Sequence, residues 1–118
     1  MHSTSMYNAS MRVTKDLVAA SAAPLILSIL EEGESYGYAL IQRVRELSDG
    51  KIEWTDGMLY PVLHRLEAQG WIESSWRTAE TGRKRNYYAL QRKGQTALQE
   101  QKEQWLVVHG TLAKLWGV

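Results

Sequence analysis

The 118-residue sequence contains no cysteine, which excludes disulfide bonds and zinc sites built on cysteine ligands. Its histidines, His2, His64 and His109, are too scattered along the chain to suggest a metal cluster. It has no run of about 18 apolar residues that could span a membrane, and its N-terminus lacks the pattern of a signal peptide. We therefore expect one soluble, cytoplasmic domain that needs neither a metal nor a cofactor.

A large charge of either sign is also missing, because the formal net charge is only +1. The basic residues are nevertheless unevenly distributed. Between Arg77 and Lys93 there are six basic side chains and a single acidic one, Glu80. A basic region on an otherwise mildly acidic chain is typical of a surface that faces phosphate. A charged loop that contacts only solvent is the alternative interpretation.

The most informative stretch runs from Thr55 to Gly70. Thr55 is a favourable N-cap and Gly70 suits the left-handed residue that ends a helix, so we predict one short helix between them. On a helical wheel, the inward stripe comprises Leu59, Val62, Leu63 and Leu66. The outer face comprises Gly57, Tyr60, Pro61, His64, Arg65 and Ala68. This slim, mixed face favours insertion into the major groove of DNA, which is wide enough for a helix.

The chain before this helix is expected to supply an arm and two further helices. Residues 1–13 show no sustained periodicity and are predicted to be a flexible arm. A helix from Thr14 to Glu32 should end at Gly33, with Pro24 either kinking it or beginning a second segment.

Ser35 is expected to cap the next helix, from Tyr36 to about Leu47. Gly37 is a weak helix former there, which indicates a close approach to another backbone. Residues 51–54 are predicted to be extended and to lead directly into the Thr55 helix.

The pattern changes from helix to strand after Gly70. Residues 71–77 and 85–90 are rich in aromatic and β-compatible side chains, and the loop between them contains Gly82. This arrangement predicts a hairpin with a basic tip.

The last 27 residues, 92–118, are predicted to form one long helix with a heptad stripe, which requires a partner helix. The predicted dimer-interface residues are Leu98, Trp105, Val108, Leu112 and Leu115. In the middle of this stripe, the Trp105 indole could stack on a planar ligand, with Val108, His109 and Leu17 as neighbours. Alternatively, Trp105 is simply a large side chain that fills the dimer core.

Two helices joined by a short connection and followed by a basic hairpin describe a winged helix-turn-helix. We therefore predict a mainly α protein with a small β-hairpin (α+β). Residues 14–91 would form its DNA-binding domain and residues 92–118 its dimerisation helix. The predicted DNA-binding residues are Tyr36, Thr55, Gly57, Tyr60, Pro61, His64, Arg65, Arg83, Lys84 and Arg85. Two alternatives stay open at this point: Tyr60 could be purely structural, and Arg65 could pair with a nearby glutamate instead of a phosphate.

Four segments together resemble the PadR family of bacterial transcriptional regulators. They are residues 27–33, 36–40, 57–70 and 83–90, and they include the Leu-Tyr-Pro-x-Leu-x-Arg-Leu-Glu run and the basic Tyr-Tyr-x-Leu strand. The resemblance covers roughly residues 17–94. The sequence departs from the family pattern at Gln91, where the family usually has threonine, and at Pro24, where many members continue a helix.

The resemblance implies a homodimeric winged-helix repressor with a single C-terminal helix in each chain. It also implies an inverted-repeat DNA operator and release by a small, often aromatic, inducer. A winged-helix module that binds an acidic protein partner without reading DNA sequence is the alternative function. An enzyme is not expected, because no nucleophile with a base at recognisable spacing and no glycine-rich phosphate loop is present.

Overall fold

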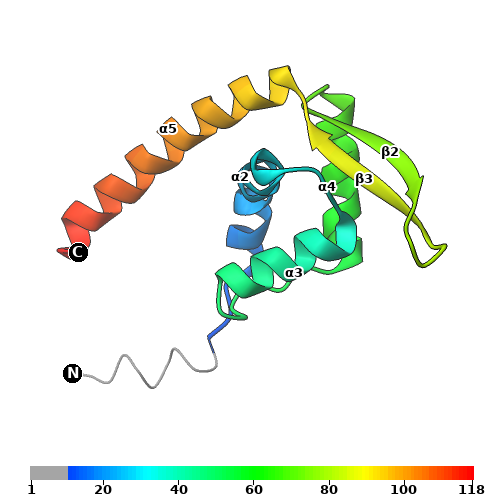
Figure 1. Cartoon of the computed structure of the whole chain (residues 1–118). Coiled ribbons are helices and arrows are strands. Elements are labelled where there is room, and N and C mark those ends of the chain that lie inside the picture. The colour runs from blue at the N-terminus through cyan, green and yellow to red at the C-terminus, as the bar shows by residue number, and fades with distance from the viewer. Residues whose placement is uncertain (1–10) are drawn as a thin grey trace.

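Residues 11–118, the part of the chain that this computed structural model describes, form four helices and three strands (Figure 1). The helices are α2 (Lys15–Glu32), α3 (Gly37–Leu47), α4 (Asp56–Ala68) and α5 (Arg92–Trp116). The strands β1 (Ser35–Tyr36), β2 (Ile72–Thr78) and β3 (Lys84–Leu90) form an antiparallel sheet in the order β1-β3-β2. The expected α+β fold with a basic hairpin is confirmed, and each end of the hairpin strands lies within one residue of the prediction.

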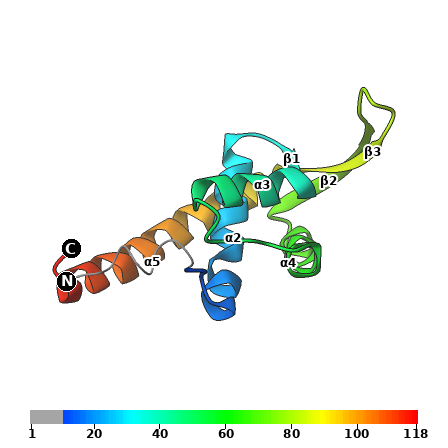
Figure 2. The same cartoon turned by 90° about the horizontal axis from the view of Figure 1, so that it is seen from below.

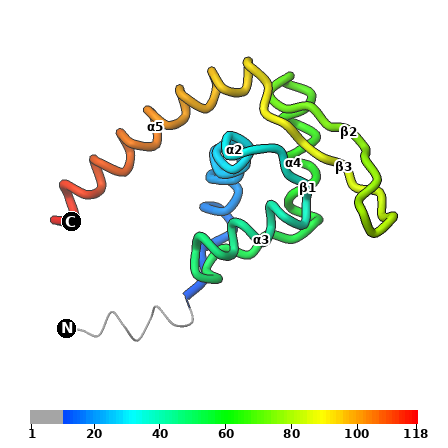
Figure 3. The backbone as a smooth tube through the Cα atoms, viewed as in Figure 1, coloured from blue at the N-terminus to red at the C-terminus, as the bar shows by residue number. Residues whose placement is uncertain are grey.

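The hydrophobic core lies where α2, α3 and α4 meet the base of the sheet. Its fully buried side chains come from every helix and from both hairpin strands: Ile26, Leu27, Leu40, Val44, Leu59, Leu63, Leu66, Ile72, Tyr88 and Leu98. The backbone tube shows how α2 passes through the middle of this arrangement, with the other helices around it (Figure 3). Because α4 places Leu59, Leu63 and Leu66 inward, its opposite side is left for other contacts.

α2 begins and ends as the sequence predicts. The Thr14 hydroxyl accepts a hydrogen bond from the Leu17 amide (3.5 Å), and the Gly33 amide donates to the Leu30 carbonyl (3.2 Å). Pro24 lies inside one continuous helix, so it does not begin a second segment.

The start of α3 differs from the prediction. Ser35 does not cap this helix, because Ser35 and Tyr36 form β1 and pair with Tyr88 and Tyr87 of β3. Tyr36 therefore occupies the N-cap position without a side-chain hydrogen bond. A two-residue strand of this kind depends on a partner some fifty residues away, and no local pattern marks it.

The segment between α3 and α4 pairs with no strand and leads directly into α4. It is held by residues near the N-terminus: the Val13 amide donates to the Lys51 carbonyl (3.0 Å), and Arg12 pairs with Glu53 (2.6 Å). Arg12 and Val13 thus lie against the body of the protein. Residues 1–10 of the predicted arm lie outside the described residues.

α5 begins next to the root of the hairpin and then leaves the body. Gly94 lies so close to the Trp71 carbonyl oxygen that no side chain fits between them, and Leu98 is buried in the core. Beyond Leu98, α5 first runs beside α2, where Lys102 pairs with Glu31 (3.1 Å), and its C-terminal part then extends away on the side opposite the hairpin (Figure 2). None of the helices in the described part of the chain is long and apolar enough to cross a membrane.

Candidate nucleic-acid interface

The outer face of α4 is positioned by its cap and by its buried stripe. The Thr55 hydroxyl accepts a hydrogen bond from the Met58 amide (3.2 Å), which confirms the predicted start of the helix. Gly70, in the left-handed conformation (φ 77°), follows its last turn. The outward residues Gly57, Tyr60, Pro61, His64 and Arg65 are all exposed, as the helical wheel predicts.

Tyr60 is held at the start of α3. A Cβ added to Gly37 would collide with the Tyr60 hydroxyl, so only glycine leaves space for this ring. The predicted close approach at Gly37 is therefore present, but the neighbour is a side chain and not a backbone. The Tyr60 and His64 rings lie one helical turn apart with centroids 6.5 Å from each other.

The hairpin is fixed beside α4 by Glu67. Its carboxylate accepts hydrogen bonds from the Ser74 hydroxyl (2.6 Å) and the Ser74 amide (3.3 Å). Glu67 is thus engaged with β2 and not with Arg65, which takes part in none of the four ion pairs found among residues 11–118. Arg65 is exposed on the surface of α4.

A cleft of about 860 Å³ separates α3 and α4 from the hairpin. Six of the predicted DNA-binding residues line it: Tyr36, Tyr60, His64, Arg83, Lys84 and Arg85. The cleft has three cationic side chains on the hairpin wall, and no carboxylate group from the described residues lines it. Such a site attracts a polyanion, and the N-terminus of α3 and the tyrosine hydroxyls beside it can add hydrogen bonds.

Four predicted residues lie outside the cleft. Thr55, Gly57, Pro61 and Arg65 are exposed along α4 but do not line it. They remain available to a ligand that covers the length of α4, so the cleft and the outer face of α4 together form one continuous surface.

The sequence prediction missed several residues of the cleft, above all Tyr38, Trp76 and Asn86. A signal for Trp76 was present, because alternate residues of a strand share a face. Ile72 is buried in the core and Ser74 bonds to α4, so Trp76 must point to the same side. Tyr38 has no comparable signal, because its position follows from β1.

Of the basic residues between Arg77 and Lys93, three line the cleft and three do not. Arg77 does not line the cleft, and it pairs instead with Glu34 (2.7 Å) while its guanidinium stacks on the Tyr87 ring at 3.8 Å. Arg85 stacks on the Tyr36 ring at 4.4 Å, which directs it along the edge of the cleft. Because Arg92 and Lys93 begin α5 outside the cleft, only part of the basic stretch in the sequence contributes to the site.

Tyr88 forms the floor of the cleft. Burial raises the pKa of its hydroxyl, the neighbouring Tyr60 and Glu67 add to this, and a hydrogen bond from Asn86 opposes it. The hydroxyl therefore stays protonated at neutral pH. In the described part of the chain, no three His, Asp or Glu side chains are grouped as a metal site would require.

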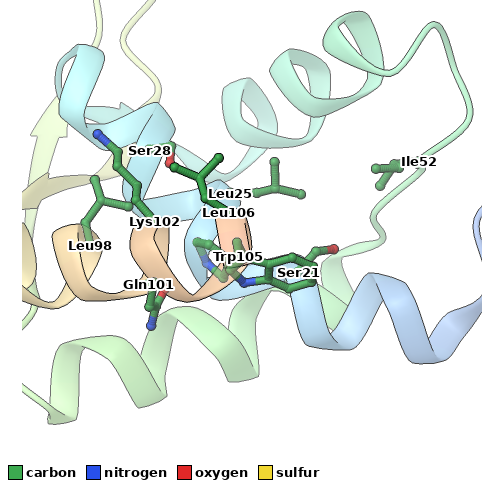
Figure 4. A pocket seen from close by; sticks show the side chains of 10 residues that line it. Ser21, Leu25, Ser28, Ile52, Leu98, Gln101, Lys102, Trp105 and Leu106 are labelled. Atoms are coloured by element: carbon green, nitrogen blue, oxygen red, sulfur yellow. The ribbon is translucent and has the colours of Figure 1, made fainter. Parts of the chain in front are cut away.

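A second depression lies between α2 and α5. It is an apolar groove of about 570 Å³ in which Trp105 faces Ser21 and Leu25 (Figure 4). Pro24, Ile52, Leu106 and the polar side chains of Gln101 and Lys102 complete the lining together with Ser28 and Leu98. The predicted neighbours of Trp105, which are Leu17, Val108 and His109, do not line this groove.

The predicted dimer stripe is largely exposed on the free half of α5. Leu115 is 77% exposed, Val108 51%, Trp105 38% and Leu112 36%. Leu98 is different, because it is completely buried in the core of its own chain and is not available to a second copy. The heptad pattern does not distinguish a residue buried in the core of its own chain from one left exposed, because α5 packs on α2 before it leaves the body.

Comparison with known proteins identifies the family. The sequence model of the PadR-like family of transcriptional regulators matches residues 26–100. The transcriptional regulator YqjI of Escherichia coli is 37% identical over 82 residues, which cover 70% of this chain but only 34% of that protein. A transcriptional regulator from Clostridium thermocellum has a similar structure, with a TM-score of 0.77 and 30% identity, over 85% of this chain and 97% of that one.

A PadR family regulator from Eggerthella lenta also has a similar structure, with a TM-score of 0.70, 35% identity and 86% of each chain covered. The family match covers more than half of the chain, including α3, α4 and both strands of the hairpin. The chain belongs to the PadR-like family of transcriptional regulators, and it is a regulator rather than an enzyme.

Proposed function

We propose that the protein is a cytoplasmic homodimeric repressor that binds an inverted-repeat DNA operator and is released by a small planar aromatic inducer. The observation that carries this proposal is the cleft beside α4. It joins a slim helical face, suited to the major groove, to the cationic hairpin side chains Arg83, Lys84 and Arg85.

In the proposed complex, α4 enters the major groove with Tyr60 and His64 directed at base edges and phosphates. Arg83 and Lys84, both exposed on the hairpin, then lie against the sugar–phosphate backbone or the neighbouring minor groove. The base edges supply specificity, and the cations supply affinity that falls as salt is added.

Dimerisation is supported by the exposed apolar residues of α5. Trp105 lines the groove against α2 and is 38% exposed, and Val108, Leu112 and Leu115 follow on the part of the helix beyond it, where a second copy can cover them. A two-fold dimer would place its two α4 helices in successive major grooves, about 34 Å apart, so an inverted repeat follows from the symmetry.

The inducer site is proposed in the groove between α2 and α5. Its walls are apolar, Trp105 offers a flat ring, and the buried side-chain amide oxygen of Gln101 (Oε1) has no hydrogen-bond partner. These features fit a planar aromatic molecule with one hydrogen-bond donor. Quenching of tryptophan fluorescence by such a compound should be lost in Trp105→Ala, and quenching that survives this substitution would place the ligand elsewhere.

The DNA-binding proposal is tested by a gel shift with the DNA upstream of the protein's own gene. A duplex with the inverted repeat found there should bind more tightly than a scrambled duplex of the same length, and the preference should persist in excess non-specific DNA. Equal affinity for both duplexes would favour the alternative function, a module that uses the basic cleft to hold an acidic protein partner.

A further inference from the structure

Trp76 presents a large apolar ring to solvent on the hairpin wall of the cleft. The side chain is 69% exposed and does not belong to the hydrophobic core. It lies on β2 opposite Asn86 of β3, and both residues line the cleft. An indole left in water at this position gains nothing for the fold, because its hydrophobic surface stays hydrated.

The surroundings of Trp76 indicate what could cover it. Along the same wall are the cations Arg83, Lys84 and Arg85, and across the cleft are Tyr60 and His64 of α4. An occupant must therefore combine negative charge with apolar surface at short intervals. The sugar–phosphate backbone of DNA has this alternation, since each phosphate is followed by a deoxyribose with an apolar face.

We propose that Trp76 packs its ring against a deoxyribose of the DNA strand that passes between α4 and the hairpin. This inference deepens the proposed function and rests on it. When α4 lies in the major groove and the hairpin reaches toward the minor groove, the backbone between the two grooves must run through the cleft. Trp76 then fixes the position of the protein on the duplex, and it does so without reading a base.

An apolar contact of this kind has a signature that separates it from an ionic one. Removing a cation that neutralises a phosphate lowers the salt dependence of binding by about one counterion. Removing Trp76 leaves the number of counterions released on binding unchanged, because the indole carries no charge. Affinity should therefore fall while the slope of log K against log salt stays the same. Loss of a contact with a sugar should also weaken binding to all duplexes alike, whereas loss of a contact with a base edge would weaken binding to the operator only.

The experiment compares Trp76→Ala and Trp76→Phe with the wild type and with Thr78→Ala, an exposed control on the same face of β2. Binding to labelled operator and scrambled duplexes is followed by fluorescence anisotropy at several salt concentrations. Trp76→Ala should weaken binding to both duplexes roughly tenfold, the value expected for losing about 55 Å² of buried apolar surface, with an unchanged salt slope. Trp76→Phe should retain most of the affinity, and Thr78→Ala should bind as the wild type does.

Three results would overturn the inference: Trp76→Ala that binds both duplexes normally, a loss confined to the operator, or a changed salt slope. Equal weakening with polyglutamate as the ligand would assign Trp76 to an acidic protein partner and would overturn it too. These failures are distinct from failure of the proposed function, in which the wild-type protein itself shows no preference for the operator.

A second measurement observes the ring directly. The difference in acrylamide quenching between the wild type and Trp76→Phe reports on Trp76 alone, although other tryptophans emit. Without DNA this difference should be large, because the ring is exposed, and saturating duplex should abolish it. A ring that stays equally accessible in the complex would overturn the inference, whatever the affinities.

Discussion

The hydroxyl of Tyr60 lies directly against the Cα of Gly37, so the first residue of α3 and the outer face of α4 fit together only because Gly37 has no side chain. This contact sets the direction of the Tyr60 ring in the cleft. It also joins the two helices at the end that faces the hairpin.

Gly37→Ala should therefore disturb the site more than the fold. The obstructing atoms belong to the Tyr60 side chain, which can move, so we expect a loss of about 1 kcal/mol in the free energy of unfolding, at the low end for overpacking. Duplex binding should weaken severalfold, because the ring is displaced. Urea unfolding and DNA titration measure the two effects. Tyr60→Phe in the same background removes the hydroxyl and should restore part of the stability; no recovery would contradict the proposed collision.

Arg83→Ala and Lys84→Ala should each weaken binding to operator and non-specific DNA by a similar factor. The salt slope should fall by about 0.9 for each phosphate that the variant no longer neutralises. Arg92→Ala is the matched control, because Arg92 is exposed and basic but lies outside the cleft. Binding titrations over a range of salt concentrations check this, and an equal effect of Arg92→Ala would show that total charge matters and not the cleft.

Leu115→Glu should convert the proposed dimer to monomers, because it places a charge on the most exposed part of the proposed α5 interface. Binding to a full inverted repeat should then fall toward that of a half-site. Val107→Glu is the control, since Val107 is similarly exposed to solvent but lies off the heptad stripe. Analytical ultracentrifugation gives the oligomeric state, and a Leu115→Glu protein that remains dimeric would exclude this interface.

Two glycines of α5 should respond to alanine in opposite ways. At Gly94 a Cβ would collide with the Trp71 carbonyl and crowd the Leu90 side chain, so Gly94→Ala should lower stability by roughly 1–3 kcal/mol or more. At Gly110 nothing lies within 4 Å, so Gly110→Ala should raise helix stability by up to about 1 kcal/mol. Thermal and urea unfolding of both variants make the comparison, and a shift in the same direction for both would contradict it.

The ion pair between Glu32 and Arg43 should be visible in the titration of Glu32. A hydrogen bond from the Arg43 guanidinium lowers the pKa of Glu32 below its ordinary value of 4.5. Because the folded value is the lower one, the pair adds stability above pH 4.5, and this is lost as the pH falls through the folded value. The effect is small, since both side chains are exposed.

Arg43→Gln should raise the pKa of Glu32 toward 4.5, as measured by NMR of the side-chain carboxyl carbon. Arg45→Gln on the same helix should leave it unchanged, because Arg45 makes no ion pair with Glu32 in the structure. An unshifted Glu32 in Arg43→Gln would show that the pair does not persist in solution.

Local sequence signals were sufficient for the parts of the fold that depend on neighbouring residues. Thr55 and Gly70 mark the ends of α4 because caps and left-handed turns act within one helical turn. The hairpin strands were likewise predictable from residue type and from the turn between them.

The remainder depends on contacts between distant parts of the chain. β1 exists only because Ser35 and Tyr36 meet β3, and its formation is what places Tyr38 in the cleft. The heptad pattern located the exposed stripe of α5, but it could not show that Leu98 is buried in the core of the same chain. The partner of Arg77 was equally hidden, because Glu34 lies more than forty residues away.

The close packing of Gly94 on the Trp71 carbonyl leaves no space for α5 to shift where it meets the hairpin. If two copies associate through α5, the distance between their hairpins is set by this stiff joint and cannot adjust to the DNA. The spacing of the two half-sites that one dimer can bind would then be fixed. Inserting or deleting a few base pairs between the half-sites should abolish binding to both at once, even when each half-site keeps its sequence.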